Sequence, residues 1–435
     1  MARLRPFSAI RYARRPSLHF SNVIAPPYDV LDERGKAALQ AKDAHNIVSV
    51  DLPHLPPKTV GPDETYEKAN IHLQSWIDAG VLIQDPRPAL YPYMQSFEHH
   101  GRTFHRHGFF ALVRLSPFGK GDVVPHEQTY KAPIEDRLKL MRATGLQLSP
   151  IFGLYSDARN EITNLLYANI GKPELSGTLD GVKHDLWSVP GAEIENEVID
   201  RMKRRPIYIA DGHHRYTTAL QYQFEMESQN GGRLPEAHPA NWCLFALVGM
   251  QDPGLIILPT HRLIGGLRNF NIREFTAALG NHVEVTETPL TGEHVDEFCR
   301  DVLPKQPQHT MGLFDGKSRK VYQLRVKNLN VIKSLEPGKS DAWCHLDVAI
   351  LQRFLLDEVL QPKFADGREP VRGYTADPDE IAPQVDGERY QIAIMLQSTP
   401  LHALEELGKH GEVMPQKSTF FYPKLATGMV MNQIR

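Results

Sequence analysis

The residues best suited to chemistry lie in the stretch PIYIADGHHRY, where an apolar run is followed by Asp211, Gly212, His213, His214 and Arg215. An imidazole can donate, accept or relay a proton near neutral pH. A guanidinium can donate two parallel hydrogen bonds to phosphate oxygens, and a glycine lets the backbone approach a ligand closely. We therefore expect this stretch to bind an anion such as phosphate.

Three other interpretations of the same residues are open. Adjacent histidines point in different directions on a helix, so one metal ion held by both His213 and His214 is less natural than a site with ligands four residues apart. His213 could simply cap a helix. Arg215 could simply pair with a buried carboxylate such as Asp211, although burying such a cluster without a use is costly.

A second group of candidates lies in the segment VVPHEQTYKAPIEDRLKL. His126, Glu127 and Lys131 are expected on a loop, where catalytic groups are often placed. The plain alternative is that Glu135 and Lys139 form a surface pair four residues apart on a helix and that the loop has no special role. Sequence spacing alone does not separate these interpretations.

Two further places could add contacts to an anion. His261 and Arg262 follow the apolar stretch ILPT and could supply a second anion contact. Near the C-terminus, Lys417, Ser418 and Lys424 flank an aromatic strand. Lysines in such positions are more often solvated strand ends than ligands.

The main candidates need a strand, a tight turn and a helix to position them. Residues 207–210 are apolar and predict a buried strand, and Asp211 with Gly212 predicts a sharp turn. Tyr216, Leu220 and Phe224 then follow at steps of four, which predicts a helix. The first N–H groups of a helix have no internal partner, so such an end attracts anions.

Capping and turn residues predict further elements. Asp32 is suited to cap a helix that follows it, and Gly80 marks the end of an amphipathic helix. His100–Gly101 is expected to turn between two strands. Pro133 suits the start of the helix that carries the EDR residues, and Gly145 suits its end.

The C-terminal region also mixes helices and strands. In HLDVAILQRFLLDEVL, Leu346, Ile350 and Phe354 follow at four-residue steps and predict a helix, whereas YQIAIML and STFFYPKL resemble strands. We expect two domains of a mixed, α+β protein. The N-terminal α/β domain would comprise residues 1–269 and a C-terminal α+β domain, packed on it, residues 270–435, with GGLRNFN as the loop signal between them.

Composition limits the function classes. The 435 residues include 49 Lys and Arg against 52 Asp and Glu, a formal net charge of -3, so no overall basic field indicates nucleic-acid or membrane binding. The three cysteines stand far apart, which disfavours a disulfide scaffold or zinc ribbon. No apolar run reaches the roughly 18 residues of a transmembrane span. We expect a cytoplasmic protein, and an organelle transit peptide is the less favoured interpretation of the Arg-rich N-terminus.

Seven motifs together resemble one known family over nearly the whole chain. They are APPYDV at residues 25–30, HExT at 126–129, EDR at 135–137, SPIF at 149–152, YIADGHHR at 208–215, LPTHR at 258–262 and KSTFFYPKL at 417–425. The sequence is identified on them as a member of the bacterial and archaeal family called domain of unknown function 1015. Members tend to carry lysine where this chain has Ile134, so a lysine role in that loop would belong to Lys131 or be absent. Members usually start near Pro6, which weakens the transit-peptide interpretation further.

The DGHHR motif is also similar to the signature of the ParB and sulfiredoxin-like superfamily, in which a turn and helix start bind nucleotide phosphates. Some members resemble free-serine kinases. This resemblance implies a ParB/sulfiredoxin-like phosphate-binding region and a phosphoryl-transfer enzyme acting on a small hydroxyl metabolite, with serine or phosphoserine as the substrate and ATP or ADP as donor.

The expected roles combine this resemblance with the chemistry of the side chains. The expected phosphate and nucleotide ligands are Asp211, Gly212, Arg215, Arg137, Lys131, His261, Arg262 and Lys417. The expected catalytic residues are Glu127, His126, His213, His214, Glu135 and Asp136. The last two are also the expected ligands of Mg2+ or Mn2+.

Two alternatives remain open at this point. A phosphatase would use the same residues with water as the acceptor, so that only its products would distinguish it. A ParB-like nucleotide switch would bind nucleotide without metabolite chemistry. The expected partners are a small-molecule substrate and a nucleotide, with a homo-oligomer left open. We expect no membrane and no nucleic acid, since no helix-turn-helix pattern is evident.

Overall fold

The computed structural model describes residues 2–168, 170–189, 191–386 and 388–435, which form two compact units. The first unit comprises Met1–Pro125, Thr129–Ile256 and Pro423–Arg435, and the second comprises His126–Gln128 and Ile257–Tyr422. The chain passes from the first unit to the second after Ile256, before the boundary expected near residue 270. The reason is that the strand His261–Gly265 pairs within the second sheet. Both units contain helices and sheets, which confirms the predicted mixed α/β class.

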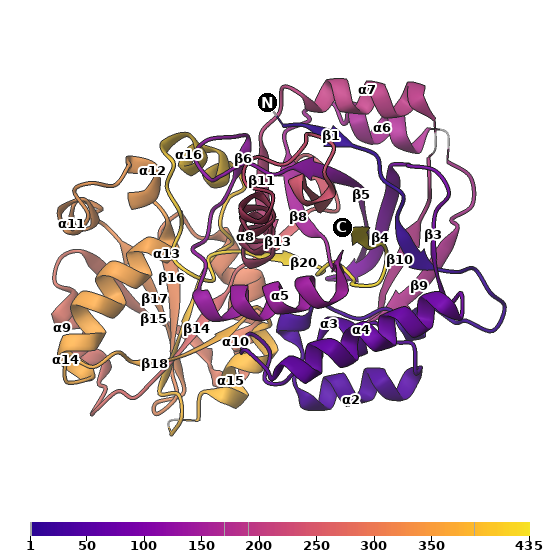
Figure 1. The fold of residues 1–435 in the computed structure, drawn as a ribbon. Coiled ribbons are helices and arrows are strands. Elements are labelled where there is room, and N and C mark those ends of the chain that lie inside the picture. The colour runs from indigo at the N-terminus through magenta and orange to yellow at the C-terminus, as the bar shows by residue number, and fades with distance from the viewer. Residues whose placement is uncertain (1, 169, 190, 387) are drawn as a thin grey trace. The chain divides into compact units, whose positions relative to one another are not determined.

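A nine-stranded sheet organises the first unit (Figure 1). Its strand order is β6-β11-β8-β12-β5-β4-β10-β9, and β1 pairs with β5. Its strands are β1 (Leu4–Arg5), β4 (Tyr91–His99), β5 (Arg102–Arg114), β6 (Val123–Val124), β8 (Ile151–Tyr155), β9 (Leu175–Leu179), β10 (Val182–Leu186), β11 (Ile207–Asp211) and β12 (Trp242–Gly249). Two small pairs accompany this sheet: β2 (Ile10–Tyr12) with β3 (Leu82–Gln84), and β7 (Leu146–Gln147) with β21 (Asn432–Gln433).

The hairpin between β4 and β5 turns at the predicted place. His100 and Gly101 have φ angles of 48° and 69°, the left-handed conformation that two-residue hairpin turns require. The register runs from Tyr91 opposite Phe110 to His99 opposite Arg102. Glycine and short polar residues tolerate this conformation, so the local sequence sets the turn.

Eight α-helices belong to the described part of the first unit. They are α1 (Phe20–Val23), α2 (Glu33–Lys42), α3 (Val48–Asp51), α4 (Asp63–Asp78), α5 (Lys131–Thr144), α6 (Glu161–Tyr167), α7 (Ala192–Met202) and α8 (His213–Gln229). Asp32 caps α2 by accepting from the Gly35 amide at 2.7 Å, and Gly145 ends α5 at φ 68°, both as predicted. None of the helices in the described residues is long and apolar enough to cross a membrane.

The predicted strand, turn and helix at PIYIADGHHRY are present as β11 and α8. The buried face of α8 differs in part from the predicted one. Tyr216, Ala219 and Tyr222 lie in the core, whereas Phe224 is 69% exposed. A buried helix face combines steps of three and four residues. A prediction that uses steps of four alone therefore drifts away from the buried face within two turns.

The second unit is built on a six-stranded sheet with the order β15-β17-β16-β19-β14-β18. Its strands are β14 (His261–Gly265), β15 (Val283–Thr291), β16 (Thr310–Asp315), β17 (Lys320–Val326), β18 (Val371–Thr375) and β19 (Ile392–Met395), and β13 (Ile256–Leu258) pairs separately with β20 (Phe420–Tyr422). The α-helices are α9 (Ile272–Leu279), α10 (Val295–Glu297), α11 (Asn330–Leu335), α12 (Asp341–Cys344), α13 (Asp347–Ile350), α14 (Gln361–Phe364), α15 (Ile381–Gln384) and α16 (His402–His410). The predicted helix around Ile350 and Phe354 is found as α13 followed by a π-helical segment, Leu351–Leu360.

Candidate functional site

The turn between β11 and α8 depends on glycine for two reasons. Gly212 has φ 94° and ψ 26°, in the left-handed region that side chains disfavour. A Cβ added there would also lie 3.0 Å from Nε of Arg215. The first backbone bond of the helix runs from the Tyr216 amide to the Gly212 carbonyl at 3.0 Å. Tyr216 is thus the first residue of α8 whose amide is bonded within the helix.

Arg215 does not have the position expected of a phosphate ligand. Its side chain folds back over the turn and is 11% exposed. One terminal nitrogen donates to Asp211 Oδ2 at 2.7 Å and the other donates to the carbonyl of Pro150. The arginine thus ties α8 to both β11 and the SPIF segment. The interpretation of Arg215 as an ion-pair partner of Asp211 describes this geometry better than the phosphate fork.

Asp211 is bound by a second cation that comes from the end of the chain. Nζ of Lys424 donates to Asp211 Oδ1 at 2.9 Å. Burial alone would raise the pKa of Asp211, but Lys424 and Arg215 outweigh it and hold that pKa below its ordinary value. Asp211 is therefore ionised at neutral pH and serves these two cations, so its predicted role as a direct phosphate ligand is not supported.

The two histidines have different environments. His213 is 4% exposed and begins α8. His214 accepts a hydrogen bond at Nε2 from the backbone amide of Tyr130 at 3.1 Å, and its ring stacks on that tyrosine at 6.2 Å between centroids. Because Nε2 accepts, the neutral ring carries its proton on Nδ1.

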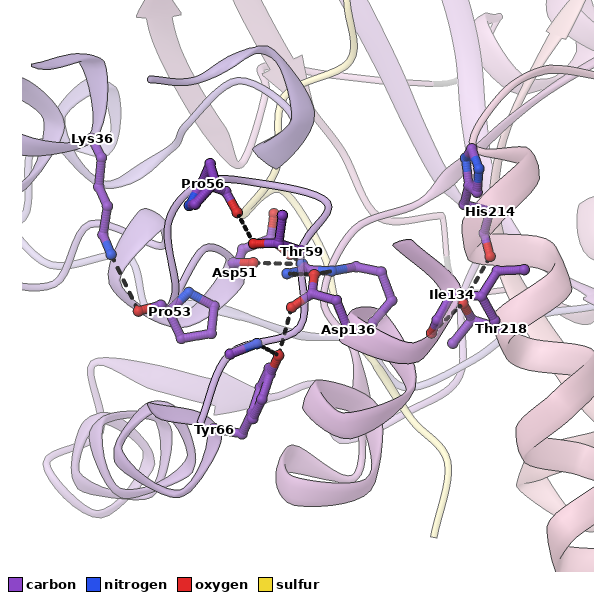
Figure 2. A network of polar contacts seen from close by, with 12 residues as sticks. Lys36, Asp51, Pro53, Pro56, Thr59, Tyr66, Ile134, Asp136, His214 and Thr218 are labelled. Carbon is purple, nitrogen blue, oxygen red and sulfur yellow. Dashed lines mark hydrogen bonds and ion pairs between the residues drawn. The ribbon is translucent and has the colours of Figure 1, made fainter. Parts of the chain in front are cut away.

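The contact between His214 and Tyr130 joins the starts of two helices. Tyr130 is the N-cap residue of α5, and Lys131 is its exposed first residue. Thr218 strengthens the junction, since its hydroxyl donates to the carbonyls of His214 at 2.8 Å and Ile134 at 3.4 Å (Figure 2). Two positive helix ends therefore share one partly exposed region of the first unit.

The EDR segment supplies structure rather than an open site. Figure 2 shows Tyr66 directing its hydroxyl at Asp136, with an O–O distance of 2.7 Å. Arg137 donates from Nε to Asp136 at 2.8 Å and from a terminal nitrogen to the carbonyl of Asp51 at 2.6 Å. Its guanidinium lies 3.9 Å from the ring centre of Tyr28. Asp136 and Arg137 are 2% and 6% exposed. Their predicted roles as base and phosphate ligand do not fit this burial, because these contacts tie α5 to the segments packed around it.

The predicted metal pair is also separated. Glu135 is exposed, while the neighbouring Asp136 is buried with Tyr66 and Arg137 as partners. Adjacent residues point in different directions on a helix, so these two carboxylates do not converge on one ion. The described residues contain no group of three or more His, Cys, Asp or Glu side chains arranged to hold a metal. Mg2+ or Mn2+ bound by this pair therefore does not fit the geometry.

A small cavity lies beside Arg137 and Arg215 in the first unit. Its volume is about 40 Å³, and Arg137, Arg215, Asp51, Ser149 and Cys243 are among the residues that line it. A space of that size suits water rather than a nucleotide, for which pockets of several hundred Å³ are usual. A nucleotide at the DGHHR turn would therefore not bind inside this cavity.

The HExT motif contacts the KSTFF motif within the second unit. His126 is 4% exposed, and its Nε2 lies 3.0 Å from the hydroxyl of Thr419. The carbonyl of His126 accepts from the Met414 amide at 2.8 Å. Glu127 accepts from the Lys417 amide at 3.4 Å, and the Lys417 side chain is exposed. This motif thus brings together a carboxylate and a lysine, while His126 itself is a structural residue.

His261 and Arg262 are buried. The prediction that they supply a second anion contact does not fit this burial. Burial lowers the pKa of His261 to about 3, so the ring is neutral, and its Nδ1 accepts from the Leu396 amide at 3.2 Å. Arg262 is 4% exposed and donates to the carbonyls of Gln416 at 3.1 Å and Lys417 at 3.0 Å. It therefore holds the Lys417 loop in place.

Two contacts that define the first-unit site were not predicted from the sequence. Lys424 reaches Asp211, and Tyr130 supplies the amide that binds His214. The KSTFFYPKL motif includes Lys424, but the residue of this motif that was expected in the site is Lys417. No sequence feature indicates the Tyr130 contact, because a backbone amide has no side-chain signature.

Comparison with known proteins gives a family and distant structural likenesses. No curated protein matches the chain. Among solved structures, a free serine kinase mutant in complex with AMP is similar with a TM-score of 0.34 and 11% identity, over 72% of this chain and 89% of the other. A conserved hypothetical protein from Pyrococcus furiosus has a TM-score of 0.30 and 14% identity, over 70% and 89%. SbnI with a C-terminal truncation from Staphylococcus aureus has 0.33 and 10%, over 73% and 86%.

The family model matches residues 4–349, most of the chain, and includes the DGHHR turn, Arg137 and Arg215. Since the match covers far more than half of the sequence, this chain belongs to the family described as protein of unknown function (DUF1015).

Proposed function

We propose that the first unit binds the phosphates of a nucleotide at the start of α8 and takes part in phosphoryl transfer to a small hydroxyl metabolite. The observation that carries this proposal is the 3.1 Å contact between the Tyr130 amide and His214 Nε2. It holds the N-terminal ends of α5 and α8 together where Lys131 and Tyr130 are exposed. Oriented amides at helix starts attract phosphate groups.

Each group at this junction has a distinct task in the proposal. The amides of His213 and His214 bind phosphate oxygens, and Nδ1–H of His214 donates to the same anion. The Lys131 ammonium, exposed at the first position of α5, adds positive charge. Arg215 keeps the turn in its left-handed shape and does not itself contact the ligand.

An acceptor hydroxyl and a base complete the proposed reaction. Serine is the acceptor that the similarity of DGHHR to free-serine kinases indicates, with ATP or ADP as donor. Phosphoryl transfer needs a group that orients the attacking hydroxyl. Asp136 is committed to Tyr66 and Arg137. Glu127, which precedes Tyr130 closely in the sequence, is the carboxylate that we propose to test as the base. Glu127→Gln is expected to keep nucleotide affinity and to reduce turnover by roughly 10²–10⁴-fold.

A nucleotide-binding switch without metabolite chemistry is the second candidate. It is favoured by the burial of Asp136 and Arg137, which removes one carboxylate and one cation from the expected catalytic set. Such a protein would bind nucleotide at the same helix start and form no product. A phosphatase would instead release phosphate from phosphoserine with water as acceptor.

The deciding experiment measures binding and products in parallel. Nucleotide affinity is measured by calorimetry with AMP, ADP and ATP, and phosphoserine is measured by mass spectrometry after incubation with serine and each nucleotide in Mg2+ buffer. His214→Ala should weaken nucleotide binding by about 3- to 10-fold, the value of one lost hydrogen bond. His72→Ala, an exposed histidine on α4, is the matched control and should change nothing.

Each outcome has a definite meaning. Phosphoserine formation supports the transferase, and tight nucleotide binding with no product supports the switch. Phosphate release from phosphoserine supports the phosphatase. A wild-type protein that binds neither the three nucleotides nor inorganic phosphate would refute the site itself.

A further inference from the structure

We propose that Lys424, rather than Arg215, is the cation that contacts the phosphate at the DGHHR turn, and that a buried Arg106–Gln95 pair positions it there. The inference rests on the proposed phosphate site in the first unit and assigns one of its ligands. It concerns a lysine from the last segment of the chain, Pro423–Arg435, which belongs to the same unit as α8.

Arg215 is a poor candidate because its contacts maintain the turn. Its two terminal nitrogens are occupied by Asp211 and the Pro150 carbonyl, and its Nε would lie only 3.0 Å from a Cβ added at Gly212. Moving the guanidinium to a ligand would break both bonds and leave a buried carbonyl unpaired, which costs free energy. Arg215 therefore forms part of the wall of the site.

Lys424 has the properties that Arg215 lacks. Its side chain is 20% exposed, compared with 11% for Arg215, and it reaches Asp211 from the other carboxylate oxygen at 2.9 Å. A lysine ammonium carries three donors on a flexible stem. It can therefore keep one contact to Asp211 and direct another donor to a phosphate oxygen without breaking the turn.

Lys424 adds a second cation to the ion pair of Asp211 and Arg215. One carboxylate, Asp211, faces two permanent cations, Arg215 and Lys424, so the trio carries one net positive charge. An excess positive charge held beside a helix start is suited to an anionic ligand. Without Lys424, Asp211 and Arg215 would simply neutralise each other.

The backbone of Lys424 is fixed by a polar pair in the middle of the sheet. Arg106 donates from Nε to Gln95 Oε1 at 3.1 Å and from a terminal nitrogen to the carbonyl of Pro423 at 2.6 Å. The Gln95 amide donates to the carbonyl of Lys424 at 2.9 Å. Consecutive carbonyls of the C-terminal segment are thus held by β4 and β5, which aims the Lys424 side chain at Asp211.

Arg106 is a buried charge, and its burial needs a physical explanation. The side chain is 1% exposed, and burial lowers its pKa to about 10, so that it is still charged at neutral pH. Its guanidinium lies 4.8 Å from the ring centre of Phe152. A buried charge is expensive. The inferred role, fixing the position of a ligand-binding lysine, provides a functional reason for that cost.

The test compares three variants of the full-length protein by calorimetry with ADP and with inorganic phosphate. Lys424→Met should weaken ADP binding by about tenfold or more, as expected for a lost charged hydrogen bond. Lys424→Arg should restore affinity to within a few-fold of wild type, because it keeps the charge and the reach. Lys183→Met is the matched control, since Lys183 pairs with Asp185 at 2.8 Å elsewhere in the unit, and it should leave affinity unchanged.

Melting temperature and near-ultraviolet circular dichroism are recorded for each variant, because a purely structural role for Lys424 would lower stability but leave the affinity of the folded protein unchanged. Wild-type binding that is retained in Lys424→Met overturns this inference and leaves the proposed function standing. Affinity lost in Lys424→Met and not restored in Lys424→Arg also overturns it, because charge is then not the cause. Absence of ADP and phosphate binding in the wild type overturns both proposals.

Discussion

Replacing Arg215 with lysine should destabilise the first unit, although the charge is kept. The guanidinium is 11% exposed and bridges Asp211 and the Pro150 carbonyl, whereas a single lysine nitrogen cannot make both contacts in the same way. The contact most readily lost is the charged hydrogen bond to the buried Pro150 carbonyl. Such a bond contributes about 1.5–3 kcal/mol, so we expect a loss of about 2 kcal/mol in the free energy of unfolding.

The pH dependence of stability tests the other contact of Arg215, its ion pair with Asp211. The pKa of Asp211 is held below its ordinary value of 3.8, so this carboxylate stabilises the fold above that pH and the contribution is lost as pH falls towards the folded-state pKa. In Arg215→Met one of the two cations is removed, and the folded-state pKa moves back towards 3.8. The fall in stability between about pH 5 and pH 2 should therefore be shallower than in the wild type.

Urea denaturation at several pH values measures both effects. Arg142→Lys is the matched control, because Arg142 pairs with Glu225 on the surface with a side chain that is 49% exposed, and such pairs contribute about 0–1 kcal/mol. If Arg215→Lys changes stability no more than Arg142→Lys while nucleotide affinity falls, then the arginine is a phosphate ligand and the structural role assigned to it is refuted.

Three further predictions follow from local geometry. Gly212→Ala should lower the free energy of unfolding by about 1–3 kcal/mol, because the residue has φ 94° and its Cβ would lie 3.0 Å from Arg215 Nε; calorimetric melting checks it, and an unchanged melting temperature would contradict it. Cys243 is 3% exposed, and burial raises the pKa of its thiol to about 12, so peptide-level mass spectrometry should find it alkylated at pH 8 only after unfolding. Asp32→Ala should cost about 1 kcal/mol in urea denaturation, because it removes the acceptor of the Gly35 amide at the start of α2, whereas Asp32→Asn should be nearly neutral.

Much of the local structure could be predicted from the sequence because its causes are local. The turn at His100–Gly101, the cap at Asp32 and the end of α5 at Gly145 each depend on residues within a few positions. The strand, turn and helix of the DGHHR stretch are predictable for the same reason. Phe224 shows the limit, because which side of α8 is buried depends on what the helix packs against.

The roles of charged residues are less predictable than the elements that carry them. Arg215, Arg137 and Asp136 are expected in an open site, yet each makes buried contacts. A sequence shows that a residue can bind phosphate or orient a proton, but not whether a neighbouring carboxylate or carbonyl already occupies it. Burial and pairing decide that, and both arise from contacts between distant segments.

The sequence by itself determined the family resemblance, the mixed α/β class and the glycine turn from which α8 starts, because each of these depends on residue type and short spacing. Only the tertiary structure decided which cations surround that turn. Lys424 lies 213 residues from Asp211 along the chain, and Arg106 holds Pro423 across 317 residues. Contacts of this kind have no periodicity or spacing to reveal them, since they form only when the sheet brings its strands and the C-terminal segment together.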